Sequence, residues 1–96
     1  MVETDIIETK NGAAMGIAIS MPKTKLLIIR AEKGYMACGY FDIKTIEALE
    51  DAAVIVKNVN SFSKMLKGKI EYVSKKAKKL GIKKQMTPMQ ALELMV

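Results

Sequence analysis

Chemically reactive side chains are scarce in this sequence, and those present exclude several reaction classes. The 96 residues contain no histidine and one cysteine, Cys38. Histidine is the usual general base and a frequent metal ligand, so its absence excludes Ser-His and Cys-His nucleophile pairs. One cysteine without histidine is also too few ligands for a structural zinc site. The sequence therefore predicts no bound metal and no cofactor, and Cys38 is the single candidate for catalysis.

Cys38 precedes Gly39 in a predicted strand, and two interpretations fit it. In the first, it is the activated thiol of a small enzyme or redox-responsive protein, and Arg30 on the neighbouring strand stabilises the thiolate. In the second, it is a small buried hydrophobic residue, as cysteine in a central strand usually is. The second interpretation is favoured, and whether the chain is an enzyme stays open.

Small residues form a second candidate site on two predicted strands. Side chains alternate between the faces of a strand, so small residues two apart share one face. Glycine within a strand often marks close approach by a ligand or another backbone. The favoured interpretation is that a helix of the same chain lies against this face, and the alternative is a ligand groove or a subunit contact. The residues are Gly16, Ala18, Ser20, Ala37 and Gly39.

Lysines form a third candidate site, in the last third of the chain. The net charge is +6, and 15 of the 16 basic residues are Lys. Lysine attracts polyanions without reading sequence, whereas nucleic-acid binders usually add arginine or stacking aromatics. A solvated helix face is therefore favoured, and a weak nucleic-acid or other polyanion interface is the alternative. The residues proposed for that interface are Lys75, Lys76, Lys79 and Lys83.

The elements that must position these residues begin with a β-meander. Asn11-Gly12 favours a tight hairpin turn, because both residues tolerate positive φ. Met21-Pro22 and Lys33-Gly34 predict two further turns. The four strands so defined cover residues 4–9, 14–21, 25–32 and 35–41.

The second half is predicted to be mostly helical. Thr87-Pro88-Met89-Gln90 is a capping box with proline at the first helical position, and it predicts a helix over 88–95. An apolar stripe with helical spacing predicts another helix that ends at Gly81. The segment 52–57 is short and β-branched, which favours a strand over a continued helix. The remaining helices are expected over 43–50 and from Ser61 to about Gly68, and the stripe consists of Ile70, Val73, Ala77 and Leu80.

These elements predict one α+β domain over residues 1–96. Its sheet is mostly antiparallel with four to five strands, and the C-terminal helices pack on one face. The lone cysteine, the acidic start of the chain and the lack of a long apolar segment predict a soluble cytoplasmic protein without a membrane partner.

The order of landmarks resembles that of the YunC-like family, small bacterial and archaeal proteins classed as a domain of unknown function. The most specific pieces are Lys33-Gly34 with Cys38-Gly39-Tyr40, and the block Asp51-Ala52-Ala53. The resemblance implies an α+β fold without an agreed activity. Family members often carry glycine where this chain has Glu50 and Asn58, so a glycine cradle is not expected in those two loops.

The leading hypothesis for function is a non-enzymatic binding or homo-oligomeric assembly domain. The face of small residues and the methionine-rich last helix are its expected contact surfaces. The second hypothesis is an enzyme or redox-responsive protein that uses Cys38, and the third is a polyanion binder.

Overall fold

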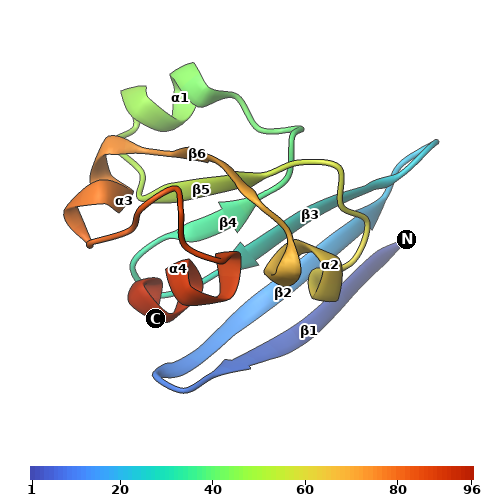
Figure 1. Ribbon diagram of the computed structural model, residues 1–96. Coiled ribbons are helices and arrows are strands. Elements are labelled where there is room, and N and C mark those ends of the chain that lie inside the picture. Colours follow the sequence, from blue (N-terminus) through green and yellow to red (C-terminus); the bar gives the residue numbers. More distant parts are fainter.

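The computed structural model describes residues 1–96 and contains one six-stranded sheet and four helices (Figure 1). The strands lie in the sheet in the order in which they occur along the chain. The elements are β1 (Val2–Thr9), β2 (Gly12–Ser20), β3 (Lys25–Arg30), β4 (Tyr35–Ala37), α1 (Ile43–Ala48), β5 (Ala53–Val56), α2 (Phe62–Lys67), β6 (Ile70–Val73), α3 (Lys75–Lys79) and α4 (Pro88–Met95).

The predicted meander is present as β1 to β4, and all three of its strand pairs are antiparallel. The predicted hairpin joins β1 to β2, but its turn lies one residue earlier than expected. Thr9 pairs with Gly12, so Lys10 and Asn11 are the central residues, and Asn11 does not have the expected positive φ. The Thr9 hydroxyl donates to the Gly12 carbonyl over 2.7 Å. The fourth strand is shorter than predicted, because it ends at Ala37. Residues 38–41 leave the sheet in a turn, in which the Phe41 N–H donates to the Cys38 carbonyl.

The sheet then continues through its one parallel pair, β4 and β5. The short helix α1 makes the crossover, and the Asp42 side chain caps it by accepting from the Thr45 N–H. The segment 52–57 contains the predicted strand, observed as β5 at Ala53–Val56. Its four side chains are all buried, as expected for a strand covered on both faces.

The prediction of one helix over the stripe Ile70, Val73, Ala77 and Leu80 is wrong. Residues 70–73 are strand β6, antiparallel to β5, and only the five residues of α3 are helical. Ile, Tyr and Val favour strands, and Ser74 then begins the helix by accepting from the Ala77 N–H. Ile70 pairs with Val56 and Val73 with Val54, and a register shift between these pairs places both side chains in the main core although they are three residues apart. The additional strand raises the count from the expected four or five to six.

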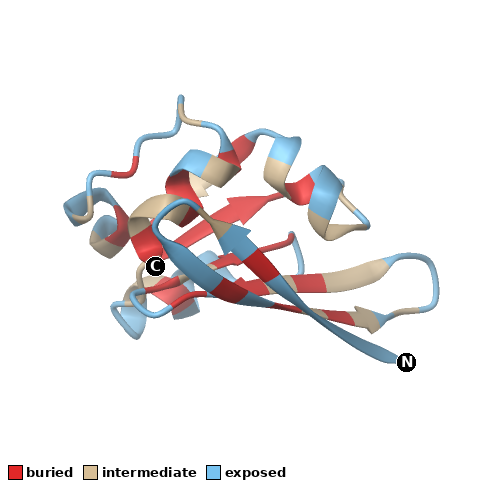
Figure 2. Ribbon diagram, turned by 90° about the horizontal axis from the view of Figure 1, so that it is seen from below, coloured by how far each residue is buried: buried red, intermediate tan, exposed pale blue.

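The two faces of the sheet are covered unequally. The C-terminal helices α2 and α4 cover one face, and the main core lies beneath them. Helix α1 covers only the β4–β5 end of the other face, where Ile46 packs with Ala37, Ala53 and Ile55. Figure 2 shows buried residues concentrated between the sheet and these helices, while the outer part of the β1–β2 hairpin is exposed.

The methionine-rich helix α4 packs on its own sheet. Ala91, Leu92 and Met95 are completely buried, and the Lys33 N–H donates to the Met95 carbonyl. The observed capping box at Thr87 and Gln90 and the bounds of α4 confirm the prediction. This helix therefore does not offer its apolar side to a partner. None of the helices has the length and apolar character that crossing a membrane requires.

Candidate functional site

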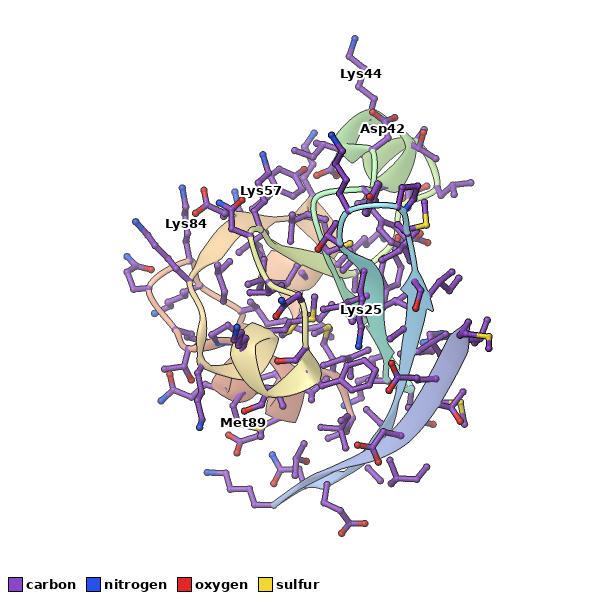
Figure 3. All side chains as sticks on the ribbon, turned by 90° about the vertical axis from the view of Figure 1, so that its right-hand side faces the viewer. Lys25, Asp42, Lys44, Lys57, Lys84 and Met89 are labelled. Atoms are coloured by element: carbon purple, nitrogen blue, oxygen red, sulfur yellow. The ribbon has the colours of Figure 1, made fainter.

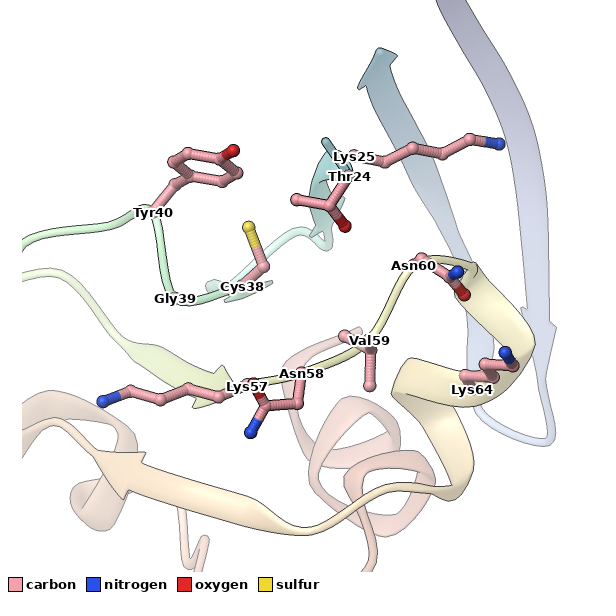
Figure 4. Close-up of a pocket in the computed structure, with 10 residues that line it drawn as sticks. All are labelled: Thr24, Lys25, Cys38, Gly39, Tyr40, Lys57, Asn58, Val59, Asn60 and Lys64. Carbon is pink, nitrogen blue, oxygen red and sulfur yellow. The ribbon is translucent and has the colours of Figure 1, made fainter. Parts of the chain in front are cut away.

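The candidate site is a pocket of about 590 Å³ beside Cys38. Two loops form opposite walls, and the start of β3 and helix α2 complete it (Figure 4). The lining residues are Thr24, Lys25, Cys38, Gly39, Tyr40, Lys57, Asn58, Val59, Asn60 and Lys64.

The position of the pocket follows from the sheet topology. Residues 38–40 come directly after β4, and residues 57–60 come directly after β5. These two strands are parallel, so both loops leave the sheet at the same edge. Ligands of open α/β sheets bind in the crevice outside the carboxyl ends of parallel strands. The pocket occupies the corresponding place in this fold.

Asn58 gives the second loop its sharp change of direction. Its φ is 61°, in the left-handed region where asparagine is the best tolerated residue after glycine. None of the backbone N–H groups of Asn58, Val59 and Asn60 donates a hydrogen bond within the chain. The same is true of Gly39 and Tyr40 on the opposite wall. Five backbone donors at the pocket are therefore left to solvent or a ligand.

The pocket is basic. Three lysines contribute to its walls, and no aspartate or glutamate does. The Lys25 ammonium already pairs with Glu3 over 3.0 Å, whereas Lys57 and Lys64 form no ion pair. Figure 4 shows Lys25 and Lys64 extending on the side where Asn60 lies, and Lys57 extending on the opposite side. Cations thus stand at both ends of the pocket.

Cys38 lies in the wall with its thiol largely covered. Its side chain is only 4% exposed, and the Leu27 N–H donates to its sulfur over 3.3 Å. The Cys38 N–H in turn donates to the Leu27 carbonyl, which extends the pairing of β3 by one residue beyond β4. This is the environment of a small buried residue, and a catalytic role of Cys38 stays a prediction.

Arg30, the cation expected to activate Cys38, lies at the other end of β3. Its guanidinium donates to the carbonyls of Ala31, Glu32 and Gly34 in the β3–β4 turn. In the β3–β4 pair, Arg30 lies opposite Tyr35, whereas Cys38 follows Ala37, which lies opposite Ile28. Arg30 therefore stabilises a turn and is not placed to stabilise a Cys38 thiolate.

The five small residues of the second candidate site do not form one surface. A Cβ built on Gly16 would lie 2.8 Å from the Phe62 ring, so α2 of the same chain covers that face, and Ala18 is buried there too. Ala37 is buried under α1 on the opposite face. Ser20 is exposed near the end of β2. Only Gly39 lines the pocket.

The lysine face is shorter than predicted because α3 has only five residues. Lys75, Lys79 and Lys83 are exposed, and the Lys76 ammonium pairs with Glu50 over 3.5 Å. Lys84, next to this face, extends outward from the chain (Figure 3). Polyanion binding by this surface stays a prediction.

Sequence reasoning identified Cys38 and Gly39 but missed the second wall of the pocket. Residues 57–60 of that wall match no motif, and their only local signal is a mostly polar run directly after the buried strand β5. Recognising that β4 and β5 are parallel would have placed this run beside Cys38. The missed lining residues are Thr24, Lys25, Tyr40, Lys57, Asn58, Val59, Asn60 and Lys64.

Comparison with known proteins places the chain in a family. Residues 37–95 match the domain of unknown function DUF1805. The chain belongs to the DUF1805 family. The match includes both loops of the pocket and Lys64, while Thr24 and Lys25 lie before it.

Two individual relatives agree with this assignment. The chain is 28% identical over 80 residues to the uncharacterized protein YunC of Bacillus subtilis, covering 79% of each chain. It also matches the crystal structure of a protein of unknown function from Thermoplasma acidophilum with a TM-score of 0.93 and 28% identity. That match covers 100% of this chain and 94% of the other. The expected resemblance to the YunC-like family and the α+β fold are thus confirmed.

Proposed function

We propose that this member of the DUF1805 family is a non-enzymatic binding domain whose ligand occupies the pocket beside Cys38. The observation that carries the proposal is the place of the pocket, between the loops that follow β4 and β5 at the carboxyl edge of the parallel pair. Its volume of about 590 Å³ is in the range of small-molecule sites.

The chemistry of the lining favours binding over catalysis. The pocket contains no carboxylate and no histidine to transfer a proton, and its one thiol is 4% exposed and hydrogen-bonded. General acid–base catalysis most often uses histidine or a carboxylate, so the proton-transfer groups that remain here are Tyr40 and the lysines. The lining instead supplies hydrogen-bond donors, which position a ligand without reacting with it.

The test is a thermal-shift screen of small metabolites against a variant whose pocket is filled. Gly39→Leu places a side chain in the pocket, and a Cβ at Gly39 meets only the flexible Lys57 side chain at 3.4 Å. Ala48→Leu adds the same side chain to the exposed surface of α1 and is the matched control. We expect a ligand that raises the melting temperature of the wild type and of Ala48→Leu, but not that of Gly39→Leu. Equal stabilisation of Gly39→Leu would contradict the proposal, as would a screen in which no compound stabilises the wild type.

Self-association is a second candidate function. The surface that favours it is not the face of small residues or the last helix, which were the surfaces expected from the sequence. The face of β1 and β2 opposite the helices carries exposed apolar side chains, with Val2 65%, Ile6 56% and Met15 46% exposed. Ile6 lies directly opposite Met15 in the register, so these side chains are neighbours. β1 is also an edge strand, whose free backbone groups can pair with β1 of a second copy.

Light scattering distinguishes this second function from the first. We expect a dimer at micromolar concentration that Ile6→Glu converts to a monomer. Leu49→Glu changes an apolar residue at the C-cap of α1 that is 66% exposed, and should leave the dimer intact. A monomeric wild type would exclude self-association and would not affect the pocket.

A further inference from the structure

We infer that the ligand of the Cys38 pocket is a small anion carrying phosphate or carboxylate groups. The inference rests on the proposed function and names the chemical class of its ligand. Three observations carry it: the sign of the charge in the pocket, the free backbone donors, and the lack of competing acidic groups.

The charged groups of the pocket are all cations. Lys57 and Lys64 have no acidic partner, and Lys25 shares its charge with Glu3. Because no carboxylate lines the pocket, nothing there offsets the potential of the two free ammonium groups. A cleft whose charges share one sign concentrates ligands of the opposite sign. A cationic ligand would be repelled, whereas an anionic ligand can pair with the exposed ammonium groups of Lys57 and Lys64.

The backbone adds donors that a lysine patch on an open surface lacks. Asn58 is left-handed with φ of 61°, and the N–H groups of Asn58, Val59 and Asn60 are unpaired within the chain. Successive free N–H groups around a left-handed residue form a concavity that binds anions. Gly39 and Tyr40 contribute two further free N–H groups from the facing wall. The five residues with free N–H groups thus line the pocket from two sides.

The side chains that complete the lining are also donors. The Thr24 and Tyr40 hydroxyls and the amides of Asn58 and Asn60 can all donate to an anionic oxygen. No side-chain hydrogen bond within the chain uses any of these four groups. The arrangement fits a ligand with several anionic oxygens better than a monovalent ion, since the free cations lie at the two ends of the pocket (Figure 4).

The decisive experiment is a calorimetric titration at low salt with inorganic pyrophosphate and, separately, with citrate. The two probes distinguish a phosphate ligand from a carboxylate ligand. The double variant Lys57→Gln/Lys64→Gln removes the two free cations of the pocket. Lys78→Gln/Lys79→Gln removes the same charge from exposed positions on α3 and controls for net charge.

We expect at least one probe to bind the wild type, with affinity reduced tenfold or more in the pocket variant and less than twofold in the α3 variant. Equal weakening by both variants would show non-specific attraction and overturn the inference. No binding of either probe would also overturn it. If neutral compounds stabilise the wild type in a manner blocked by Gly39→Leu while neither anion binds, the pocket binds ligands but not anions. Failure of the inference and failure of the proposed function are then distinguishable.

Discussion

Glu50 is held in a backbone conformation that costs stability, and replacing it with glycine should return that stability. Its φ is 57°, and it follows α1 at the position where a helix ends in a left-handed residue. The Asp51 N–H donates to the Ile46 carbonyl and the Glu50 N–H to the Glu47 carbonyl, the pattern of a Schellman motif. Glycine is the usual residue at this position because it has no Cβ.

The expected change in the free energy of unfolding follows from one stabilising effect and two that oppose it. A left-handed conformation costs a residue with a Cβ about 1–2 kcal/mol. Glycine offsets about 0.5–1 kcal/mol of the gain from removing this strain, because the unfolded chain has a larger conformational entropy with glycine at this position. The exposed ion pair between Glu50 and Lys76, at 3.5 Å, contributes a few tenths of a kcal/mol at most. We therefore expect Glu50→Gly to raise the free energy of unfolding by about 0.5 kcal/mol.

Glu50→Ala is the control that isolates the backbone effect. It removes the same ion pair but keeps the strained conformation, so it should be about 1 kcal/mol less stable than Glu50→Gly. For a domain of this size, that difference corresponds to about 4–8 °C in melting temperature. Urea unfolding of the three proteins measures it. If the alanine variant is as stable as the glycine variant, the left-handed conformation of Glu50 does not carry the cost assigned to it.

Three further predictions concern the fold that positions the pocket. Ser74 is completely buried, and its hydroxyl accepts from the N–H groups of Ala53 and Ala77 and donates to the Asp51 carbonyl. Ser74→Ala should therefore lower the free energy of unfolding, measured in urea, by about 2–3 kcal/mol. A loss no larger than the roughly 1 kcal/mol of an ordinary helix cap would contradict this. A Cβ on Gly34 would lie 2.3 Å from the Ala52 carbonyl oxygen, so Gly34→Ala should cost about 2 kcal/mol, whereas Gly39→Ala should be nearly neutral. Burial, and then the hydrogen bond to Asp51, raise the pKa of Tyr35 above its usual range. The folded state therefore keeps this proton longer than the unfolded state, and stability should fall as the pH rises above about 10; Tyr35→Phe should show a shallower decline in unfolding free energy over that range.

The sequence determined most of the fold where a local signal was unambiguous. Asn11-Gly12 located the first hairpin to within one residue, and the capping box at Thr87 located the start of α4, because each signal depends on residues only a few positions apart. The stripe from Ile70 to Leu80 misled because Ile70 and Val73 have the spacing of one helix face, and a bulge in the β5–β6 pair lets them share one face of a strand as well. Packing against β5 decided between them, and no local pattern contains that contact.

The candidate site was harder to predict because it is assembled from distant segments. Cys38 and Gly39 were identified by residue type, but Lys57 and Asn60 became relevant only through the parallel pairing of β4 and β5. The positions of Glu50 and Asn58 show a related effect. Family resemblance implied glycine there, and both residues are left-handed, so the backbone requirement persists although this chain lacks the glycine.

The measurement that tests the central claim most directly is an amide-resolved NMR titration of the wild-type chain at low salt with inorganic pyrophosphate and, separately, with citrate. The pocket predicts saturable shifts of the Gly39, Tyr40, Asn58, Val59 and Asn60 amides, which are the free backbone donors of its two walls. It also predicts that the amides of α3 stay unchanged. Shifts confined to Lys75–Lys79, or no saturable shift at any amide, would contradict the claim that the loops after β4 and β5 form an anion-binding site.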